Sequence, residues 1–502
     1  MFIMIKFGQM NILKIMKRKV ISRVCFLASA IALLTACGPV LREGIITTFD
    51  SQVINKYWNF DGTGVQGNVI ALDKVNSKLT SKFSLRNFVL NMRIKTTSSA
   101  EGFVLFHTPA GGASVIHGYQ VVINNNDYRK GSPQKTGSLS LIRNNFVRTV
   151  SDDNWFDLQI IVRANRIRVL VNNKLISEYV EPLNPKRIPG LEKVVLSEGY
   201  IVLQKSNSHG TIQVEEIRIE PLSADLARET PDPLSVDETG EALNLLNQLG
   251  FPVIDYHGHL KGGLTVEQVC EHGRTSGYNF GISPNCGLNF PVTNDSSLVA
   301  YYEGLEAEPV FKAMQCEGRE WITLFSPSAI SKYDYIFTDA MTWTDHKGRR
   351  MRLWINEETF VDDEQQFMDM LVGKIEAVLY NEPVDIHVNP TYLPAVIAAD
   401  YDRLWTTERM ERVIKALKDN DVALEINARF KIPSIVFIKK AKAAGVKFTL
   451  GTNNADQTDL NRLEYCLRAI GEAGITSEDI FIPRPAGDKK VLKKGLPSKI
   501  TG

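Results

Sequence analysis

The sequence lacks an excess of either charge. Its 58 Lys and Arg residues are balanced by 57 Asp and Glu residues, which gives a formal net charge of +1. Proteins that attract nucleic acid or an acidic surface over a broad face need a clear positive excess. The composition therefore argues against a nucleic-acid partner and favours a neutral or small ligand.

Cysteine is also scarce, with 6 residues in a chain of 502. No two of them have the C-x-x-C spacing, and four of them lie in the second half of the chain. In an oxidising compartment four cysteines can form three different pairings, so spacing alone decides nothing. We interpret them as small buried apolar side chains, namely Cys270, Cys286, Cys316 and Cys466.

Long apolar runs are missing except near the N-terminus. Three basic residues, 17–19, precede an apolar run at 24–34 that is short for a membrane span. The four residues at the end of this run and just after it, Leu34-Thr35-Ala36-Cys37, resemble a bacterial lipobox. The resemblance implies cleavage before Cys37 and lipidation of its thiol. We expect a signal peptide over residues 1–37 and a lipid-anchored extracytoplasmic protein. Because Gly38 is not an aspartate, we expect the outer membrane or periplasm of a Gram-negative bacterium. The alternative is an ordinary signal peptide with a coincidental cysteine.

The chain has 502 residues, which is too long for one ordinary hydrophobic core, and 44% of them are hydrophobic. A stretch rich in proline, acidic residues and serine runs from 221 to 239 and has little apolar periodicity, which is typical of a domain boundary. We predict a first domain over residues 47–222, a linker over 223–239 and a second domain over 240–502.

The first domain is predicted to be all-β. Short alternating apolar runs follow one another between clusters of Gly, Asn, Asp and Ser, and no long helical period interrupts them. This pattern favours a jelly-roll sandwich. The expected strands are 88–94, 102–107, 119–124, 139–142, 155–162, 167–171, 199–204 and 212–219.

An ordered set of short motifs in this domain resembles the 3-keto-disaccharide hydrolase family. The motifs lie at 118–123, 135–137, 153–155, 199–204, 209–210 and 216–219. The resemblance implies a concanavalin-like, laminarinase-like sandwich that acts on glycosides oxidised at carbon 3.

One of these motifs departs from that family at two positions. The family has a glutamate and, two residues later, a glutamine where this chain has Gln120 and Val122. A neutral amide cannot act as a carboxylate base, so acid–base chemistry is not expected from Gln120. Strand alternation places both residues and Asn124 on one face of a sheet. Trp155 is either a stacking platform for a sugar or a buried core residue, and His107 is a further candidate. We expect a sugar cleft with substrate-binding residues Gln120, Asn124, Lys135, His209 and Trp155.

The second domain changes to a strand-then-helix rhythm, which predicts a parallel TIM-like α/β barrel. Residues Met410, Val413, Ile414 and Leu417 have the spacing of one buried helix face. The expected strands are 253–256, 278–283, 321–325, 335–338, 384–388, 422–426, 446–450 and 480–482.

Polar residues follow several of these strands, at the rim where such barrels gather their chemistry. We predict one divalent metal ion, zinc or manganese, with Glu425, His387 and Asp339 also acting in catalysis. The alternatives are that the H-x-H pair lies on a surface loop, that His387 is a core histidine, and that Glu425 pairs with Arg429. The predicted ligand set is His257, His259, His387, Asp339, Glu425 and Asn453.

The order of these motifs resembles the polymerase and histidinol phosphatase (PHP) domain, a distorted barrel whose members are typically metal-dependent phosphoesterases. The H-x-H pair and the Glu-Ile-Asn step at 425–427 match, but the motifs at 281–285 and 451–456 have lost acidic or histidine residues. The losses imply one ion rather than a trinuclear cluster. The segment 340–360 is expected to be a loop or hairpin, and its arginines 349, 350 and 352 form either an anion site or a solvated charge run.

Together these features predict a metal-assisted hydrolase that acts on carbohydrate. The other hypotheses are a glycan-binding lipoprotein with an inactive barrel, and a phosphoesterase of the PHP type.

Overall fold

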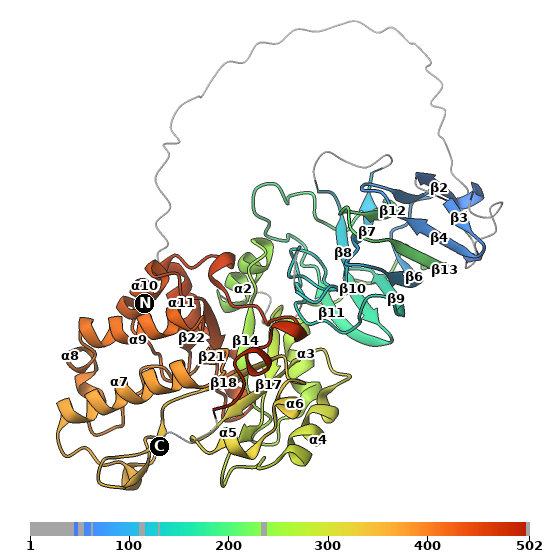
Figure 1. Ribbon diagram of the computed structural model, residues 1–502. Coiled ribbons are helices and arrows are strands. Elements are labelled where there is room, and N and C mark those ends of the chain that lie inside the picture. Colours follow the sequence, from blue (N-terminus) through green and yellow to red (C-terminus); the bar gives the residue numbers. More distant parts are fainter. Residues whose placement is uncertain are drawn as a thin grey trace, which may run out of the picture.

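Two antiparallel sheets packed face to face form the first half of the chain, and a parallel barrel forms the second half (Figure 1). The computed structural model describes residues 45–48, 55–61, 64–109, 116–128, 131–231 and 238–497. The expected lipidation site Cys37 lies outside them. Each half has its own hydrophobic core.

Among the described residues the larger sheet of the sandwich has eight strands and the smaller sheet has five. The larger sheet has the order β11 (Lys174–Val180), β10 (Arg166–Val171), β9 (Trp155–Arg163), β6 (Phe88–Thr96), β13 (Ile212–Pro221), β4 (Val69–Leu72) and β3 (Gly64–Gln66), with β1 (Ile45–Thr48) paired to β13. The smaller sheet has the order β2 (Trp58–Asp61), β5 (Lys78–Ser81), β12 (Tyr200–Lys205), β7 (Glu101–Thr108) and β8 (Tyr119–Asn124).

Alternation along the strands builds the core of the sandwich. In β6 every second side chain, from Phe88 to Ile94, is buried between the sheets, and the intervening ones are half-buried. The predicted jelly-roll sandwich is confirmed. The strand expected at 139–142 is wrong: this segment is a turn in which Leu141 has φ 64° and the Arg143 amide bonds back to the Leu139 carbonyl at 2.8 Å. A left-handed residue cannot continue an extended strand.

Parallel strands within the described stretch 238–497 close into a barrel, as predicted. The pairing runs β15–β14–β23–β22–β21–β18–β17, and β17 also pairs with β15. Their bounds are β14 (Ile254–Gly258), β15 (Asn279–Ile282), β17 (Phe311–Cys316), β18 (Tyr335–Thr338), β21 (Ile386–His387), β22 (Ala423–Asn427) and β23 (Phe448–Gly451). The short β16 (Asn285–Cys286) pairs with β17, and β19 (Thr342–Thr344) forms the expected hairpin with β20 (Arg350–Arg352).

Helices surround the barrel. The longer ones are α2 (Glu238–Gln248), α3 (Val266–Ser276), α4 (Asp295–Leu305), α7 (Glu364–Asn381), α9 (Thr407–Asp419), α10 (Ile435–Ala443) and α11 (Glu464–Ala473). The shorter ones are α5 (Trp321–Leu324), α6 (Pro327–Ile330), α8 (Tyr401–Leu404) and α12 (Lys490–Lys493). In α9 the predicted face of Met410, Val413, Ile414 and Leu417 is buried, and Thr406 caps the first turn. Of the helices in the described part of the chain, none combines the length and apolar character of a membrane span.

One barrel strand differs from the prediction. The expected strand at 321–325 is wrong, because this segment forms α5, whose Trp321 indole donates to Glu382 at 2.8 Å. The strand in that place is β17, which the sequence hides because Lys312 and Gln315 interrupt its apolar run although all six of its residues are buried. At 480–482 only a single bridge, from Ile480 to Phe448, is formed.

The two halves share an interface. Phe146 and Val147, which belong to the sandwich by sequence, pack in the barrel core. The Asn144 amide N–H donates to Asn247 Oδ1 at 3.0 Å, and the Phe146 N–H donates to Asn279 Oδ1 at 2.9 Å. Buried hydrogen bonds and apolar contacts therefore join the sandwich to α2 and β15. The four cysteines of the second half are free and buried, in agreement with their interpretation as small buried side chains; they are Cys270, Cys286, Cys316 and Cys466.

Candidate functional site

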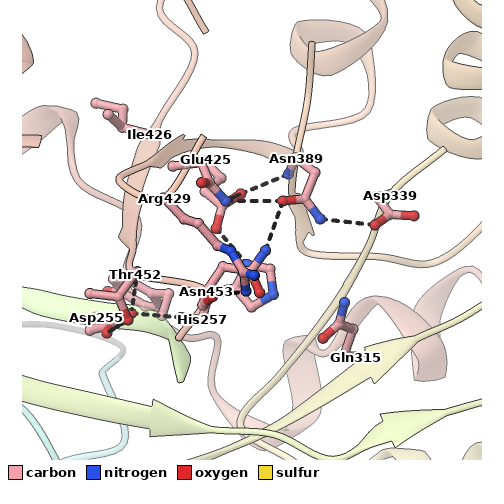
Figure 2. A network of polar contacts seen from close by, with 12 residues as sticks. Asp255, His257, Gln315, Asp339, Asn389, Glu425, Ile426, Arg429, Thr452 and Asn453 are labelled. Carbon is pink, nitrogen blue, oxygen red and sulfur yellow. Dashed lines mark hydrogen bonds and ion pairs between the residues drawn. The ribbon is translucent and has the colours of Figure 1, made fainter. Parts of the chain in front are cut away.

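The C-terminal ends of the barrel strands carry a buried polar network (Figure 2). His257 at the end of β14 donates from Nδ1 to Glu425 Oε1 of β22 at 2.6 Å, and both side chains are buried. A carboxylate that accepts this hydrogen bond requires a proton on Nδ1, and in the neutral ring this tautomer has its lone pair on Nε2. His257 and Glu425 thus lie together, as the sequence predicts.

His259 has the same arrangement. Its Nδ1 donates to the Ser283 carbonyl at 2.9 Å, and its ring centre lies 5.2 Å from that of His257. Burial lowers the pKa of His259 well below its ordinary value, which keeps the imidazole neutral. Within the described residues, neither Nε2 has a hydrogen-bond partner. The two imidazoles have their Nδ1 atoms held from behind, an arrangement that directs each Nε2 atom towards a ligand.

Amide side chains fill most of the remaining network. Asn389 donates to Asp339 Oδ2 at 3.0 Å, and its oxygen accepts from Asn427 at 3.0 Å and from Asn453 at 3.1 Å (Figure 2). The Asn389 backbone N–H donates to Glu425 Oε2 at 2.7 Å. The two carboxylates that the sequence nominates are therefore already hydrogen-bonded to protein donors.

The structure does not bring His387 to this network. In β21 His387 lies beside Thr338 and Leu424, whereas Ile386 lies beside Phe337. Neighbours in a parallel sheet point to the same side, and Phe337 contacts His257 inside the barrel at 4.8 Å between rings. His387 therefore points to the opposite side, where burial lowers its pKa to about 4. The side chain that reaches the mouth here is that of Asn389, in the segment after this strand.

Glu317 is a residue that the sequence analysis missed. It directly follows β17, is 4 % exposed, and accepts a hydrogen bond from Asn285 Nδ2 at 2.6 Å. Burial and the neighbouring Asp339 raise its pKa to about 8, and burial also raises the pKa of Asp339. Its position directly after a barrel strand could have identified Glu317 as a candidate site residue, but that strand was not recognised in the sequence.

The side chains at the barrel mouth supply only some of the ligands that a metal ion requires. The Nε2 atoms of His257 and His259 are suitable ligands. Nevertheless, nowhere in the described ranges do three or more His, Cys, Asp or Glu side chains form a group that could hold a metal ion. The predicted six-residue set is therefore not assembled, since His387 points away and Asp339 and Glu425 bond to amides.

The sandwich has a second polar site, on the outward face of its smaller sheet. Tyr119, Val121 and Ile123 of β8 point into the core, so Gln120, Val122 and Asn124 share the other face of the sheet, as predicted. Gln120 is half-buried on this face, whereas Val122 and Asn124 are buried. Pairing with β7 sets Glu101 beside Asn124, Phe103 beside Val122 and Leu105 beside Gln120. Glu101 and Phe103 therefore share this face, and the sequence analysis named neither of them.

Glu101 is linked to Lys135 through one amide. Asn126 Nδ2 donates to Glu101 Oε1 at 3.0 Å, and Lys135 Nζ donates to Asn126 Oδ1 at 2.6 Å. Lys135 is 1 % exposed and lies over the Tyr128 ring at 4.2 Å. Burial lowers the pKa of Lys135 to about 7. Burial also raises the pKa of Glu101, although the charges of Lys135 and His209 oppose the rise.

Other predicted residues have different places. Asn124 donates to the carbonyls of Ser132 and Gln134, at 2.9 and 2.8 Å, so it holds a loop. Trp155 is half-buried on the larger sheet under Lys95 and does not meet Gln120. His209 is exposed, whereas His107 is buried.

The arginines of the β19–β20 hairpin are paired with acids. Arg349 bonds to Asp345 at 2.7 Å and to Asp362 at 2.5 Å. Arg350 pairs with Glu320, and Arg352 pairs with Glu358. These contacts favour the charge-run interpretation over an anion site.

Comparison with known families finds one match in the first half. The profile of the 3-keto-alpha-glucoside-1,2-lyase-like domain matches residues 44–220. The resemblance predicted for this domain is confirmed. The matched range includes Glu101, Lys135 and His209. The comparison with curated proteins finds no match.

Solved structures resemble each half of the chain. A glycosyl hydrolase-like protein from Parabacteroides distasonis is 16% identical, covers 33% of this chain and 88% of its own, and has a TM-score of 0.29. A carbohydrate-binding module from Bacillus subtilis is 14% identical, covers 32% and 94%, and has a TM-score of 0.24. A histidinol phosphate phosphatase from Lactococcus lactis, solved with zinc, histidinol and phosphate, is 15% identical, covers 47% and 98%, and has a TM-score of 0.34.

Proposed function

We propose that the protein cleaves carbohydrates oxidised at carbon 3 and that the chemistry takes place on the outward face of the smaller sheet. The observation that carries the proposal is the Glu101–Asn126–Lys135 chain within the matched family domain. It supplies a carboxylate to a face where the family's glutamate position is Gln120.

A ketone at carbon 3 acidifies the hydrogen on carbon 2, so a carboxylate can remove it. Glu101 takes this proton, and the glycosidic oxygen leaves carbon 1 with its bonding electrons and takes a proton from a water molecule. The resulting hydroxide adds to carbon 1, and Glu101 returns a proton to carbon 2. The raised pKa of Glu101 makes it a stronger base than an ordinary glutamate. Lys135 is a positioning residue, because it fixes the Asn126 amide that holds Glu101. On the same face Gln120 can bond to hydroxyl groups and Phe103 can stack on a sugar ring.

The test uses the full-length protein with a disaccharide oxidised at carbon 3 and with its unoxidised parent. We expect cleavage of the oxidised sugar only. Cleavage of the parent at a similar rate would overturn the role of the ketone. Binding of both sugars without cleavage of either would support the alternative of a glycan-binding protein.

A second candidate is metal-dependent hydrolysis at the barrel, which the free Nε2 atoms of His257 and His259 favour. These two side chains would hold a zinc or manganese ion, and such an ion would lower the pKa of a bound water or polarise a carbonyl or phosphoryl oxygen. Elemental analysis of the wild type and His257→Ala tests it, with the exposed His209→Ala as control. A stoichiometric ion lost only in His257→Ala supports the site, and no ion in the wild type removes it.

We further propose that the protein is extracytoplasmic and is anchored through lipid on Cys37. The lipobox-like sequence supports this location. Labelling with a radioactive fatty acid in a bacterial host tests it, since Cys37→Ala should abolish incorporation. Labelling that persists in the variant would contradict the anchor.

A further inference from the structure

A groove of about 570 Å³ lies beside the polar network of the barrel mouth. Its volume is within the range of pockets that bind small molecules, roughly 300–1,000 Å³. Four aromatic side chains contribute to it, from the segments that follow β21 and β22 and from α8 and α11. They are Tyr392, Tyr401, Phe430 and Tyr465.

The backbone segments that carry two of these rings are hydrogen-bonded to the mouth itself. The Tyr392 N–H donates to the Asn389 carbonyl at 3.1 Å, and the Phe430 N–H donates to Asn427 Oδ1 at 2.9 Å. Asn389 and Asn427 are themselves joined at 3.0 Å. The rings of Tyr392 and Phe430 meet edge to face with centres 4.9 Å apart. The amide network and the aromatic groove are therefore one continuous structure.

The other two rings have their hydroxyl groups engaged by the protein. Tyr401 bonds to Thr391 Oγ1 at 2.5 Å and accepts from the Ser434 N–H at 3.2 Å. Tyr465 donates to the Pro433 carbonyl. Their rings are thus held in fixed orientations, which lowers the entropy cost of binding a ligand against them.

Polar side chains of both signs border the rings. Lys431 and Arg468 are exposed and positive, and Asp402 is exposed and negative. Rigid rings with hydrogen-bonding groups of both charges suit a neutral molecule that has an apolar face and several hydroxyl groups. A pyranose ring has both features. A singly charged ligand would meet a like charge in this groove.

We propose that this groove is a carbohydrate-binding subsite that takes one neutral pyranose unit, which packs in the corner between the rings of Tyr392 and Phe430. The inference rests on the proposed function only for the class of ligand. It makes the barrel a sugar-binding partner of the sandwich, whether or not the barrel performs chemistry.

The test is calorimetric titration of the full chain with maltose, cellobiose and trehalose, none of which is oxidised. The background variant is Phe103→Ala, which removes the aromatic ring on the sandwich face. We expect one of these sugars to bind this background, and Tyr392→Ala to weaken that binding at least 10-fold, in line with the loss of one stacking contact. Tyr392→Phe should bind as the background does, because the ring is kept. Tyr380→Ala, which removes an exposed ring on α7, is the matched control and should change nothing.

Three results would overturn the subsite: no binding of any of the three sugars, equal binding by Tyr392→Ala, or tighter binding of glucose 6-phosphate than of glucose. Failure here is distinguishable from failure of the proposed function, because cleavage of an oxidised disaccharide is measured separately and depends on Glu101.

Discussion

The two polar sites differ in how their carboxylates are satisfied. At the barrel mouth, Glu425 and Asp339 accept hydrogen bonds from an imidazole and from asparagine groups that also bond to one another. On the sandwich face, Glu101 accepts from the side-chain amide of Asn126, which Lys135 holds from the other side, and from the backbone of Ser132. The first arrangement is closed among protein groups, whereas the second leaves a half-buried carboxylate on an outward face.

The presence of acidic residues at a site therefore does not by itself predict acid–base chemistry at that site. A carboxylate with several protein donors is stabilised in its charged form and is a weaker base. A desolvated carboxylate with fewer donors has a raised pKa and is a stronger base. Burial also raises the pKa of Asp339 and Glu317 at the barrel mouth. Glu101 differs from them because its side chain is only half-buried and lies on an outward face, where a substrate can reach it.

The largest expected effect comes from Glu101→Gln. The amide keeps the size of the side chain but cannot accept a proton, so cleavage of an oxidised disaccharide should fall by roughly 10²–10⁴-fold. Initial rates measure this change. Trp155→Phe, on the larger sheet, is the control and should keep the wild-type rate. Equal losses in both variants would mean that the smaller sheet has no special role.

The next effect concerns His107, a buried histidine of the sandwich that bonds to the Arg86 carbonyl at 3.0 Å. Burial lowers its pKa from 6.5 to about 4, so only the unfolded chain takes up a proton between these values. Its contribution to stability is present above pH 6.5 and is lost as the pH falls to 4. The free energy of unfolding that separates wild type from His107→Gln should therefore shrink by roughly 3 kcal/mol over this range. Denaturant titrations at several pH values measure it. A difference independent of pH would contradict the assignment.

A smaller loss of stability is expected at the interface between the halves. Asn247→Ala removes the acceptor of the buried Asn144 N–H, which should cost roughly 1–3 kcal/mol. Thermal unfolding should then show the barrel and sandwich separating into two transitions. Asn154→Ala, at an exposed turn of the sandwich, provides the comparison. An unchanged melting curve for Asn247→Ala would show that this contact does not couple the halves.

The smallest effect is a shift in the pH dependence of the cleavage rate when Lys135 is replaced. The charge of Lys135 lowers the pKa of Glu101, so Lys135→Met should raise that pKa. Activity requires the ionised carboxylate and is lost as the pH falls, so the acidic limb should move to higher pH. Lys95→Met, beside Trp155, should leave the limb in place. A change in rate without a shift of the limb would assign Lys135 a purely structural role.

Much of the architecture could be predicted from the sequence. Alternating apolar residues specify the sandwich strands, and the spacing of Met410, Val413, Ile414 and Leu417 specifies one face of α9. The strand β17 could not be recognised, because Lys312 and Gln315 lie in its buried run. Their burial depends on contacts made only in the folded barrel, such as Lys312 Nζ to the Glu308 carbonyl at 3.0 Å.

The sites were harder to predict than the folds. The H-x-H pair and Glu425 converge as expected, but His387 points away because strand pairing fixes the side to which it faces. The sequence could not show this side without the register. Glu101 was missed for a similar reason, since only the pairing of β7 with β8 sets it beside Asn124.

The most direct test of the account follows the hydrogen on carbon 2. A disaccharide oxidised at carbon 3 is cleaved in heavy water by the wild type and by His257→Ala, and nuclear magnetic resonance measures deuterium at carbon 2 of the released 3-keto sugar against an enzyme-free control. We predict that both proteins incorporate deuterium and that Glu101→Gln does not. Incorporation that is lost in His257→Ala and kept in Glu101→Gln would place the chemistry in the barrel and contradict the account.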